Sequence, residues 1–290
     1  MKFIDPKRAK PTVRQWFAWP QRFYPLDPFR INNIEPRRLL RKIRVLEFSF
    51  NNRSVLLGLT LVLASALARA ADFDYYVLSL SLAPAFCEMK AHDYRPPRQC
   101  AALTAASFRA TPLTLHGLWP DRRDGRHPDC APGWVRGGFC RMAPVPLSAL
   151  LARELDRFMP GRADCLDRHE WAKHGACTGL SAETYFADAA RLTARADRAL
   201  GPTIAAYAGQ TIPLETLRAA LDKADPALRA ATQFDCRTPR GYGRLSMLTE
   251  VRIYFTRGAD GQPGNPLPLR ALGRDFNSGC RAGRAYVDLP

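Results

Sequence analysis

Histidine is scarce in this chain and unevenly placed. Three of its five histidines fall in two short segments, LHGLWP at 115–120 and HEWAKHGAC at 169–177. Histidine is the side chain whose charge ordinarily changes near neutral pH, so these two segments are candidates for proton-transfer chemistry. The other two, His92 and His127, lie in polar loops, and we expect them to be ordinary surface residues.

The second segment predicts a short helix with a polar face. At about 100° per residue, Glu170, Lys173 and His174 fall within an arc of about 140° that begins at His169. A solvated helix face with two i,i+4 pairs is the plain alternative. Two imidazoles beside a lysine and a glutamate are an uncommon choice for such a surface, which favours a functional site.

A zinc site is a further alternative for the same helix. The zinc motif His-Glu-x-x-His places both imidazoles on one side of a helix. Here the spacing is one residue longer, so the imidazoles of His169 and His174 diverge by about 140°. Lys173 would also place a cation between the two ligands, which is electrostatically poor. We therefore expect no metal.

Acid–base catalysis of phosphoryl transfer fits these residues better. One histidine as base and one as acid, with a lysine to neutralise an anion, suit an in-line displacement at phosphorus. RNA carries its own nucleophile, the 2′-hydroxyl, so no serine, cysteine, metal or cofactor is required. Trp119 can stack on a base exposed from a single strand, or it can be a buried core residue. Single-stranded RNA is thus the expected partner.

The paired segments LHGLWP and HEWAKHGAC closely resemble the two signature segments of the ribonuclease T2 family, the secreted acid ribonucleases. Their order, their separation and the eight-cysteine layout resemble the bacterial periplasmic members, and the resemblance covers residues 73–290. It implies an α+β domain with a central antiparallel sheet packed by helices. It also implies an endoribonuclease that cleaves single-stranded RNA through a 2′,3′-cyclic phosphate without metal, and we expect a monomer.

The resemblance implies a role for each matching polar residue. His174 matches the general base that takes the 2′-hydroxyl proton, and His116 matches the general acid that protonates the leaving 5′-oxygen. His169 matches the family's phosphate-binding histidine. Glu170 and Lys173 match the pair that supports the pentacovalent phosphorane, where a cation offsets the growing negative charge.

Two further residues are expected to contact the bases. Trp119 matches the base-stacking residue, and Asp121 falls where some family members use an acid to recognise the base. The chain departs from the family at Leu82, before Ala83-Pro84, where many members have a tryptophan, and at Ala176, where threonine is frequent. Neither position supplies chemistry. A second base pocket is not assigned from the sequence.

The composition is that of a globular protein. Of the 290 residues, 47% are hydrophobic and 24% are charged, which excludes a disordered chain, a collagen-like repeat and a coiled coil. The formal net charge is +16, and residues 1–70 contribute 14 Lys+Arg against 4 Asp+Glu. The remainder is only moderately basic, which suits an anionic partner without identifying one.

The N-terminal region has the pattern of an export signal. The apolar run Val55–Ala68 follows Arg53 and ends at Ala68-Arg69-Ala70, small residues at the positions that a signal peptidase reads. A buried core helix or a signal anchor is the alternative. We expect residues 1–53 to be a basic, proline-containing extension without a fold, 54–70 to be the signal segment and 71–290 to be the ribonuclease domain. Export to the periplasm or the medium follows, with no membrane attachment after cleavage.

All eight cysteines follow Ala70, and an even count in an exported chain indicates a disulfide framework. The absence of a Cys-x-x-Cys pair argues against structural zinc. Spacing alone leaves about 105 connectivities open. The family resemblance implies four pairs: Cys87–Cys100, Cys130–Cys177, Cys140–Cys165 and Cys236–Cys280.

Strands and helices are expected to alternate without the regular spacing of βαβ units, which indicates the α+β class. Alternating apolar residues predict strands, and helical spacing predicts helices that end at glycine or proline. The predicted strands are 73–82, 112–118 and 245–256, and the predicted helices are 147–158, 167–174, 181–200 and 214–221.

Overall fold

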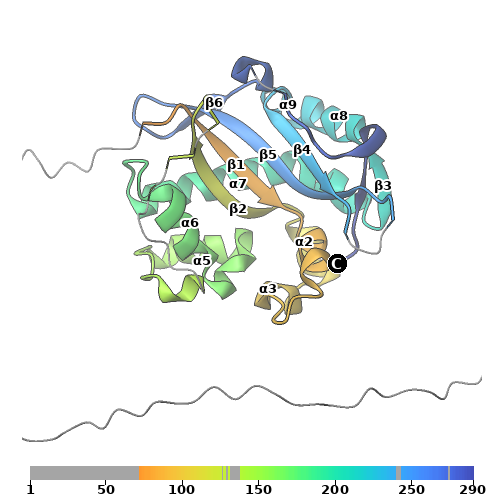
Figure 1. The fold of residues 1–290 in the computed structure, drawn as a ribbon, viewed down its shortest axis with the longest axis horizontal. Coiled ribbons are helices and arrows are strands. Elements are labelled where there is room, and N and C mark those ends of the chain that lie inside the picture. Colours follow the sequence, from red (N-terminus) through yellow and green to blue (C-terminus); the bar gives the residue numbers. More distant parts are fainter. Residues whose placement is uncertain (1–71, 126, 129, 131–137, 240–242, 274) are drawn as a thin grey trace, which may run out of the picture. The chain divides into compact units, whose positions relative to one another are not determined.

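A seven-stranded sheet organises the part of the chain that the computed structural model describes, namely residues 72–125, 127–128, 130, 138–239, 243–273 and 275–290 (Figure 1). These residues belong to one compact unit. The predicted extension at 1–53, the signal segment at 54–70 and its cleavage site lie outside the described residues.

The strands are ordered β2-β1-β5-β7-β3, with β4 and β6 both paired to β5. All pairs are antiparallel except β5–β7, which meets in parallel at Met247 and Tyr286. The bounds are β1 Tyr75–Ser81, β2 Thr114–Asp121, β3 Gln210–Pro213, β4 Thr232–Arg237, β5 Met247–Arg257, β6 Pro263–Pro266 and β7 Arg284–Val287. The α+β class with a central sheet is confirmed. The short strands β3, β4, β6 and β7 were not among the predicted elements.

The helices lie around this sheet, and α7 crosses behind it in the view of Figure 1. The pairs α2–α3 and α5–α6 lie beside its lower end. The bounds are α2 Ala83–Lys90, α3 Arg98–Ala101, α4 Ala105–Ala110, α5 Ala149–Phe158, α6 Leu166–Glu170, α7 Ala182–Ala206, α8 Leu214–Ala224 and α9 Pro226–Arg229. Short 3₁₀ turns include η2 Phe139–Arg141 and η3 Pro160–Asp164, and a π turn, η4, spans Trp171–Gly175.

Both faces of β1 are buried, each against a different apolar cluster. Tyr76, Leu78 and Leu80 alternate into the main core beneath α7. On the opposite face Tyr75 and Val77 join a smaller apolar cluster. Because successive side chains of a strand point to opposite sides, one apolar run can serve two clusters. This second face is the one that carries the polar residues described below.

Helix α7 is longer than its sequence predicts. Gly201-Pro202 was expected to end it, but the helix continues to Ala206 with Pro202 inside. Leu200 and Ile204 are fully buried on either side of the proline. Their burial in the core outweighs the loss of one backbone hydrogen bond, because tertiary packing supplies most of the stability of a helix in a protein.

Four disulfides close the loops of the domain. They join Cys87 to Cys100, Cys130 to Cys177, Cys140 to Cys165 and Cys236 to Cys280, which are the pairs that the family resemblance implies. The second of them ties the segment after β2 to the residues that follow the π turn. A disulfide of this kind limits how far β2 and the π turn can separate.

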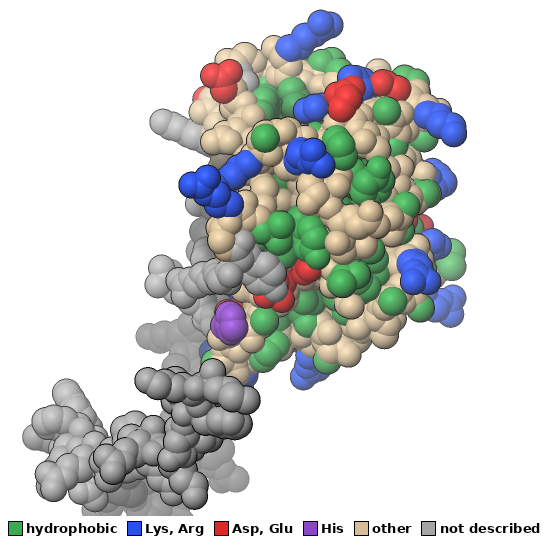
Figure 2. Space-filling model, turned by 90° about the vertical axis from the view of Figure 1, so that its right-hand side faces the viewer, with side chains coloured by type: hydrophobic (Ala, Val, Ile, Leu, Met, Phe, Trp, Pro, Cys, Tyr) green, Lys and Arg blue, Asp and Glu red, His purple; other side chains and the backbone are tan. Residues whose placement is uncertain are grey.

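Basic side chains are spread over the surface rather than gathered. Figure 2 shows Lys and Arg scattered over one face, with acidic residues among them. On that face, charge alone does not mark a binding surface. Within the described part of the chain, no helix combines the length and the apolar character needed to cross a membrane.

Candidate active site

A β-bulge places His116 on the polar face of the sheet. In the β1–β2 pairing, Leu80 lies opposite Leu115 and Ser79 lies opposite Gly117, so His116 is an extra residue on β2. A bulge changes the side-chain alternation locally and re-aims a side chain. Leu115 and Leu118 therefore both enter the core, while His116 is only partly buried on the other face.

The second segment is not the regular helix that was predicted over 167–174. Helix α6 ends at Glu170, and the chain continues as the π turn Trp171–Gly175, in which the N–H of Ala176 donates to the carbonyl of Trp171 at 2.8 Å. The wider turn changes the angle between side chains from the α-helical value. Such π turns occur frequently at functional sites. Here Glu170 and His174 are buried, whereas Lys173 is exposed.

Trp119 joins the two segments. Its ring centroid lies 5.2 Å from that of His116 and 5.5 Å from that of His174. Its indole N–H donates to Glu170 Oε2 at 2.8 Å. The indole therefore lies in contact with both histidines and also fixes the carboxylate. Only glycine fits at position 117, because a Cβ there would lie 2.0 Å from Glu170 Oε2.

His169 occupies a separate corner of the site. Its ring stacks on Phe139 with centroids 4.2 Å apart and an interplanar angle of 22°. Phe139 precedes Cys140, whose disulfide to Cys165 anchors it beside α6. The centroid of His169 lies 6.4 Å from that of His174. The structure thus brings together His116, Trp119, His169, Glu170 and His174, with Lys173 on the same turn.

The environment keeps two of the histidines neutral. Burial, followed by the positive charge of Lys173, lowers the pKa of His174 to about 2. Burial and then Lys173 also lower the pKa of His169 to about 4. A neutral imidazole has a lone pair, so His174 can accept a proton over most of the pH range.

His116 shifts in the opposite direction. Burial lowers its pKa, but the hydrogen bond from its Nδ1 to Glu250 Oε1 at 2.9 Å, together with the negative charge of Glu170 where that carboxyl is ionised, outweighs this effect, so the pKa is raised. Burial raises the pKa of Glu170 to about 7, against the lowering effects of His116, Trp119 and Lys173. The site therefore contains a proton donor and a proton acceptor on different elements.

Asp121 lies at the far end of β2, where its carboxylate is buried. It accepts a hydrogen bond from the Tyr75 hydroxyl at 2.9 Å and one from the backbone N–H of Arg122 at 2.8 Å. His127 Nδ1 lies 3.5 Å from Asp121 Oδ1, and its ring lies 6.4 Å from that of His174. His127 is exposed as predicted, but it also borders the site, which the sequence did not indicate. His92 is exposed and contributes nothing here.

A cavity of about 350 Å³ opens beside these residues. Residues of α2, η3 and α6 line it, together with two of the histidines. Its lining includes Ser81, Phe86, Leu115, His116, Phe139 and His169. Within the described residues, no group of three or more His, Cys, Asp or Glu side chains is arranged to hold a metal ion.

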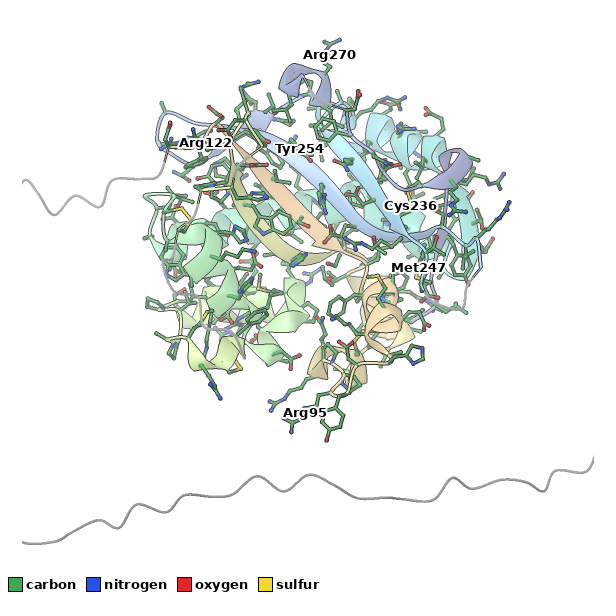
Figure 3. The ribbon with its side chains drawn as sticks, viewed as in Figure 1. Arg95, Arg122, Cys236, Met247, Tyr254 and Arg270 are labelled. Atoms are coloured by element: carbon green, nitrogen blue, oxygen red, sulfur yellow. A yellow bond between two sulfur atoms is a disulfide. The ribbon has the colours of Figure 1, made fainter. Side chains whose placement is uncertain are left out.

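Three residues of the site were not predicted from the sequence: Glu250, Arg252 and Phe139. Glu250 and Arg252 lie on β5 between Met247 and Tyr254, which Figure 3 shows toward opposite ends of that strand. A signal was present, since two charged residues alternate within the otherwise apolar run LTEVRIYFT. That alternation indicates a polar face of a strand but not which strand lies beside it.

Comparisons with known proteins identify one family. The sequence model of the Ribonuclease T2 family matches residues 73–262. Ribonuclease I of Escherichia coli (strain K12) is 32% identical over 227 residues, covering 69% of this chain and 83% of that protein. A ribonuclease of Aeromonas hydrophila is 34% identical over 132 residues, covering 44% of this chain and 50% of that protein.

Solved structures show the same fold at lower identity. Ribonuclease MC1 from bitter gourd seeds superposes with a TM-score of 0.51 at 20% identity, covering 74% of this chain and 100% of that chain. RNase NT in complex with 5′-AMP superposes with a TM-score of 0.51 at 15% identity, covering 76% of this chain and 99% of that one.

Proposed function

The chain belongs to the ribonuclease T2 family and is an endoribonuclease of that type, and on this premise we propose that it cleaves single-stranded RNA by metal-independent transesterification. The 2′-oxygen attacks the adjacent phosphorus and the bond from phosphorus to the 5′-oxygen breaks. The products are a 2′,3′-cyclic phosphate and a free 5′-hydroxyl, so no water takes part in this step.

One observation carries the assignment of acid and base. His116 and His174 both contact Trp119 from different elements, and their pKa values move in opposite directions. Titratable groups whose environments push their pKa values apart are suited to opposite roles. The neutral His174 takes the 2′-hydroxyl proton, and His116 gives its proton to the leaving 5′-oxygen.

The remaining polar residues stabilise the charge that develops on the phosphate. Lys173 supplies a cation beside His174, and His169 is proposed to contact the phosphate, which its stacking on Phe139 supports by fixing the ring. The raised pKa of Glu170 keeps its carboxyl protonated in acid, so it can donate to a phosphate oxygen there. Groups aimed at developing charge in a partly buried site are worth more than they are in water.

The cavity beside His116 is proposed to take the nucleoside on the leaving side. The proposed acid and the proposed phosphate-binding residue, His169, both line it, and the nucleoside carrying the 5′-oxygen would lie beside them. Crystal structures of RNase MC1 mutants contain 5′-UMP or 5′-GMP, which supports a nucleotide ligand for this fold. Trp119 and Asp121 remain the proposed contacts for the other base.

A substrate with one altered sugar tests the mechanism. An oligonucleotide with a single 2′-deoxy sugar at the scissile position lacks the nucleophile but keeps the phosphate. It should bind and remain uncut, while the all-ribose control yields cyclic-phosphate ends with or without a chelator. Cleavage of the deoxy substrate, or a requirement for divalent metal, would contradict the assignment of His174 as base.

We further propose that the enzyme is exported after cleavage behind Ala70. The apolar run, Arg53 and the Ala-Arg-Ala sequence support this, as do four disulfides, which persist in oxidising compartments. N-terminal sequencing of the exported protein should begin at Ala71. A mature chain that still contains residues 1–50 would contradict the proposal.

A further inference from the structure

A carboxylate from another strand contacts the proposed general acid. Glu250 lies on β5 and His116 lies on β2, yet Nδ1 of the histidine is 2.9 Å from Oε1 of the glutamate. Strand β1 lies between them. Neighbouring strands are about 4.8 Å apart, so the two side chains bridge a backbone separation of about 10 Å. This contact is not local in the sequence and needs three strands in register.

Small residues on the middle strand make the bridge possible. Ser79 lies opposite Gly117 on β2 and opposite Arg252 on β5, and Ser81 lies opposite Glu250. Farther along the same face of β1 the residues are large, Tyr75 and Val77. A large side chain at 79 or 81 would fill the space over which the glutamate reaches.

The carboxylate is itself held by a second ion pair. Arg252 donates from Nη2 to Glu250 Oε2 at 2.6 Å, and its Nε lies 3.4 Å from Asp235 Oδ2 on β4. Its guanidinium also lies 5.9 Å from the centre of the Trp119 ring. Glu250 thus uses one oxygen for the histidine and the other for the arginine, which leaves it little freedom to turn away from His116.

We propose that Glu250 is a positioning residue for His116: it fixes the Nδ1–H tautomer, directs Nε2 toward the leaving oxygen and keeps the imidazole protonated until the transfer. This inference rests on the proposed function, in which His116 is the acid. The hydrogen bond that one ring nitrogen makes decides which nitrogen carries the transferable proton. Glu250 touches no reacting atom and acts only through the histidine.

Charged groups on several elements act on the pKa of His116, and the carboxylates among them favour its protonated form. On β5, Glu250 raises the pKa of His116 and Arg252 lowers it, while Glu170 of α6 raises it. The positive charge of His116 in turn lowers the pKa of His169 and that of His174. Burial raises the pKa of Glu250, but His116 and then Arg252 outweigh this and lower it to about 2. The glutamate is therefore ionised over most of the pH range.

The pH dependence of cleavage tests the negative charge of Glu250 separately from the size of its side chain. In Glu250→Gln the side chain keeps its length and can still accept the hydrogen bond, but the negative charge is gone. The pKa of His116 should then fall by about 1–2 units, the ordinary effect of losing an opposite charge in contact. In the pH profile of kcat, the descending limb reports the loss of the proton from His116. This limb should move to lower pH by the same amount, while KM changes little. NMR titration of the His116 ring should show the same shift directly.

A second variant of Glu250 tests the position of its carboxylate, and a variant outside the site serves as control. In Glu250→Asp the charge remains, but the carboxylate withdraws by one methylene and the 2.9 Å contact breaks. We expect a lower kcat with a smaller shift of the limb. Asp225→Asn is the matched control, since Asp225 pairs with Arg195 at 2.5 Å outside the site. It should leave the limb unchanged.

The outcomes distinguish the two proposals. If His116→Ala abolishes cleavage while Glu250→Gln and Glu250→Asp both keep the wild-type limb and kcat, the inference about Glu250 is wrong and the proposed function stands. If His116→Ala cleaves normally, the proposed function itself fails. If Glu250→Gln does not fold, Glu250→Asp and the NMR titration still decide the matter.

Discussion

Gly117 should be as important for catalysis as the residues that do the chemistry. It lies between His116 and Leu118 on β2, and it does not adopt a positive φ, so alanine is allowed by its backbone. The obstacle is space. A Cβ at this position would lie 2.0 Å from Glu170 Oε2 and 2.4 Å from Trp119 Nε1. The single methyl of Gly117→Ala would therefore intrude on the hydrogen bond between those two side chains.

The size of the effect follows from these distances. Contacts of a real Cβ are essentially never shorter than 3.0 Å, so the carboxylate must move by about 1 Å. Glu170 is 1% exposed and cannot turn toward solvent. Losing its 2.8 Å bond to Trp119 leaves buried polar groups unpaired, which costs about 1–3 kcal/mol of stability. A misplacement of about 1 Å can lower turnover by about 10²-fold.

The assay compares kcat for a defined oligonucleotide with the free energy of unfolding in urea. Trp119→Phe is the comparison variant, because it removes the N–H donor of the same hydrogen bond without adding a methyl group at position 117. Both single variants should lose activity through the same bond, so the double variant should lose less than the product of the two effects. Wild-type turnover and stability in Gly117→Ala would refute this reasoning.

Other predictions concern the acid, the base and their supports. His116→Ala and His174→Ala should each lower kcat by about 10²–10⁴ or more, and the double variant should be far from additive; near-normal turnover of either single variant contradicts the pair. Glu170 has a folded pKa of about 7, above its ordinary 4.5, so its contribution to stability is full below pH 4.5 and is lost as the pH rises through 7. Compared with Glu170→Gln, the wild type should lose about 3 kcal/mol of its free energy of unfolding in urea over that pH range. The same pH dependence in both proteins would refute the raised pKa of Glu170. Tyr185→Phe removes a buried 2.6 Å hydrogen bond to the Leu118 carbonyl and should lower the free energy of unfolding by about 1–3 kcal/mol. An unchanged free energy of unfolding would contradict this prediction.

The parts of the site that the sequence predicts are those that are local in the chain. The residues of LHGLWP and of HEWAKHGAC lie within a few positions of one another, so a spacing argument can gather them. The angle between His169 and His174 could not be predicted in this way. It depends on the π turn, whose i→i+5 hydrogen bond leaves no mark in the hydrophobic period.

The end of α7 could not be predicted from local sequence signals either. Glycine followed by proline is a strong signal for the end of a helix, yet here the helix continues through Pro202. What decides the outcome is the burial of Ile204 against residues distant in the sequence. Local signals predict where a helix can end, whereas packing determines where it does end.

The partner of His116 could not be found by spacing at all. Glu250 is separated from it by 134 positions, and the contact exists because β1 pairs with both β2 and β5. The alternation of serines in β1 and of charged residues in β5 indicated two polar strand faces, but only the strand order puts them side by side.

The acid and the base are therefore held by different kinds of structure, and this has a consequence for the pH range of the enzyme. The pKa of His174 is set by burial in the π turn and by Lys173, whereas that of His116 is set by an ion pair across the sheet. Burial and Lys173 lower the pKa of His174 more than His116 does, so a substitution on β5 should move the descending limb of the activity profile much more than the ascending limb. Because the base stays neutral far into acid while the acid keeps its proton toward neutrality, both are in their working protonation states over a broad acidic range.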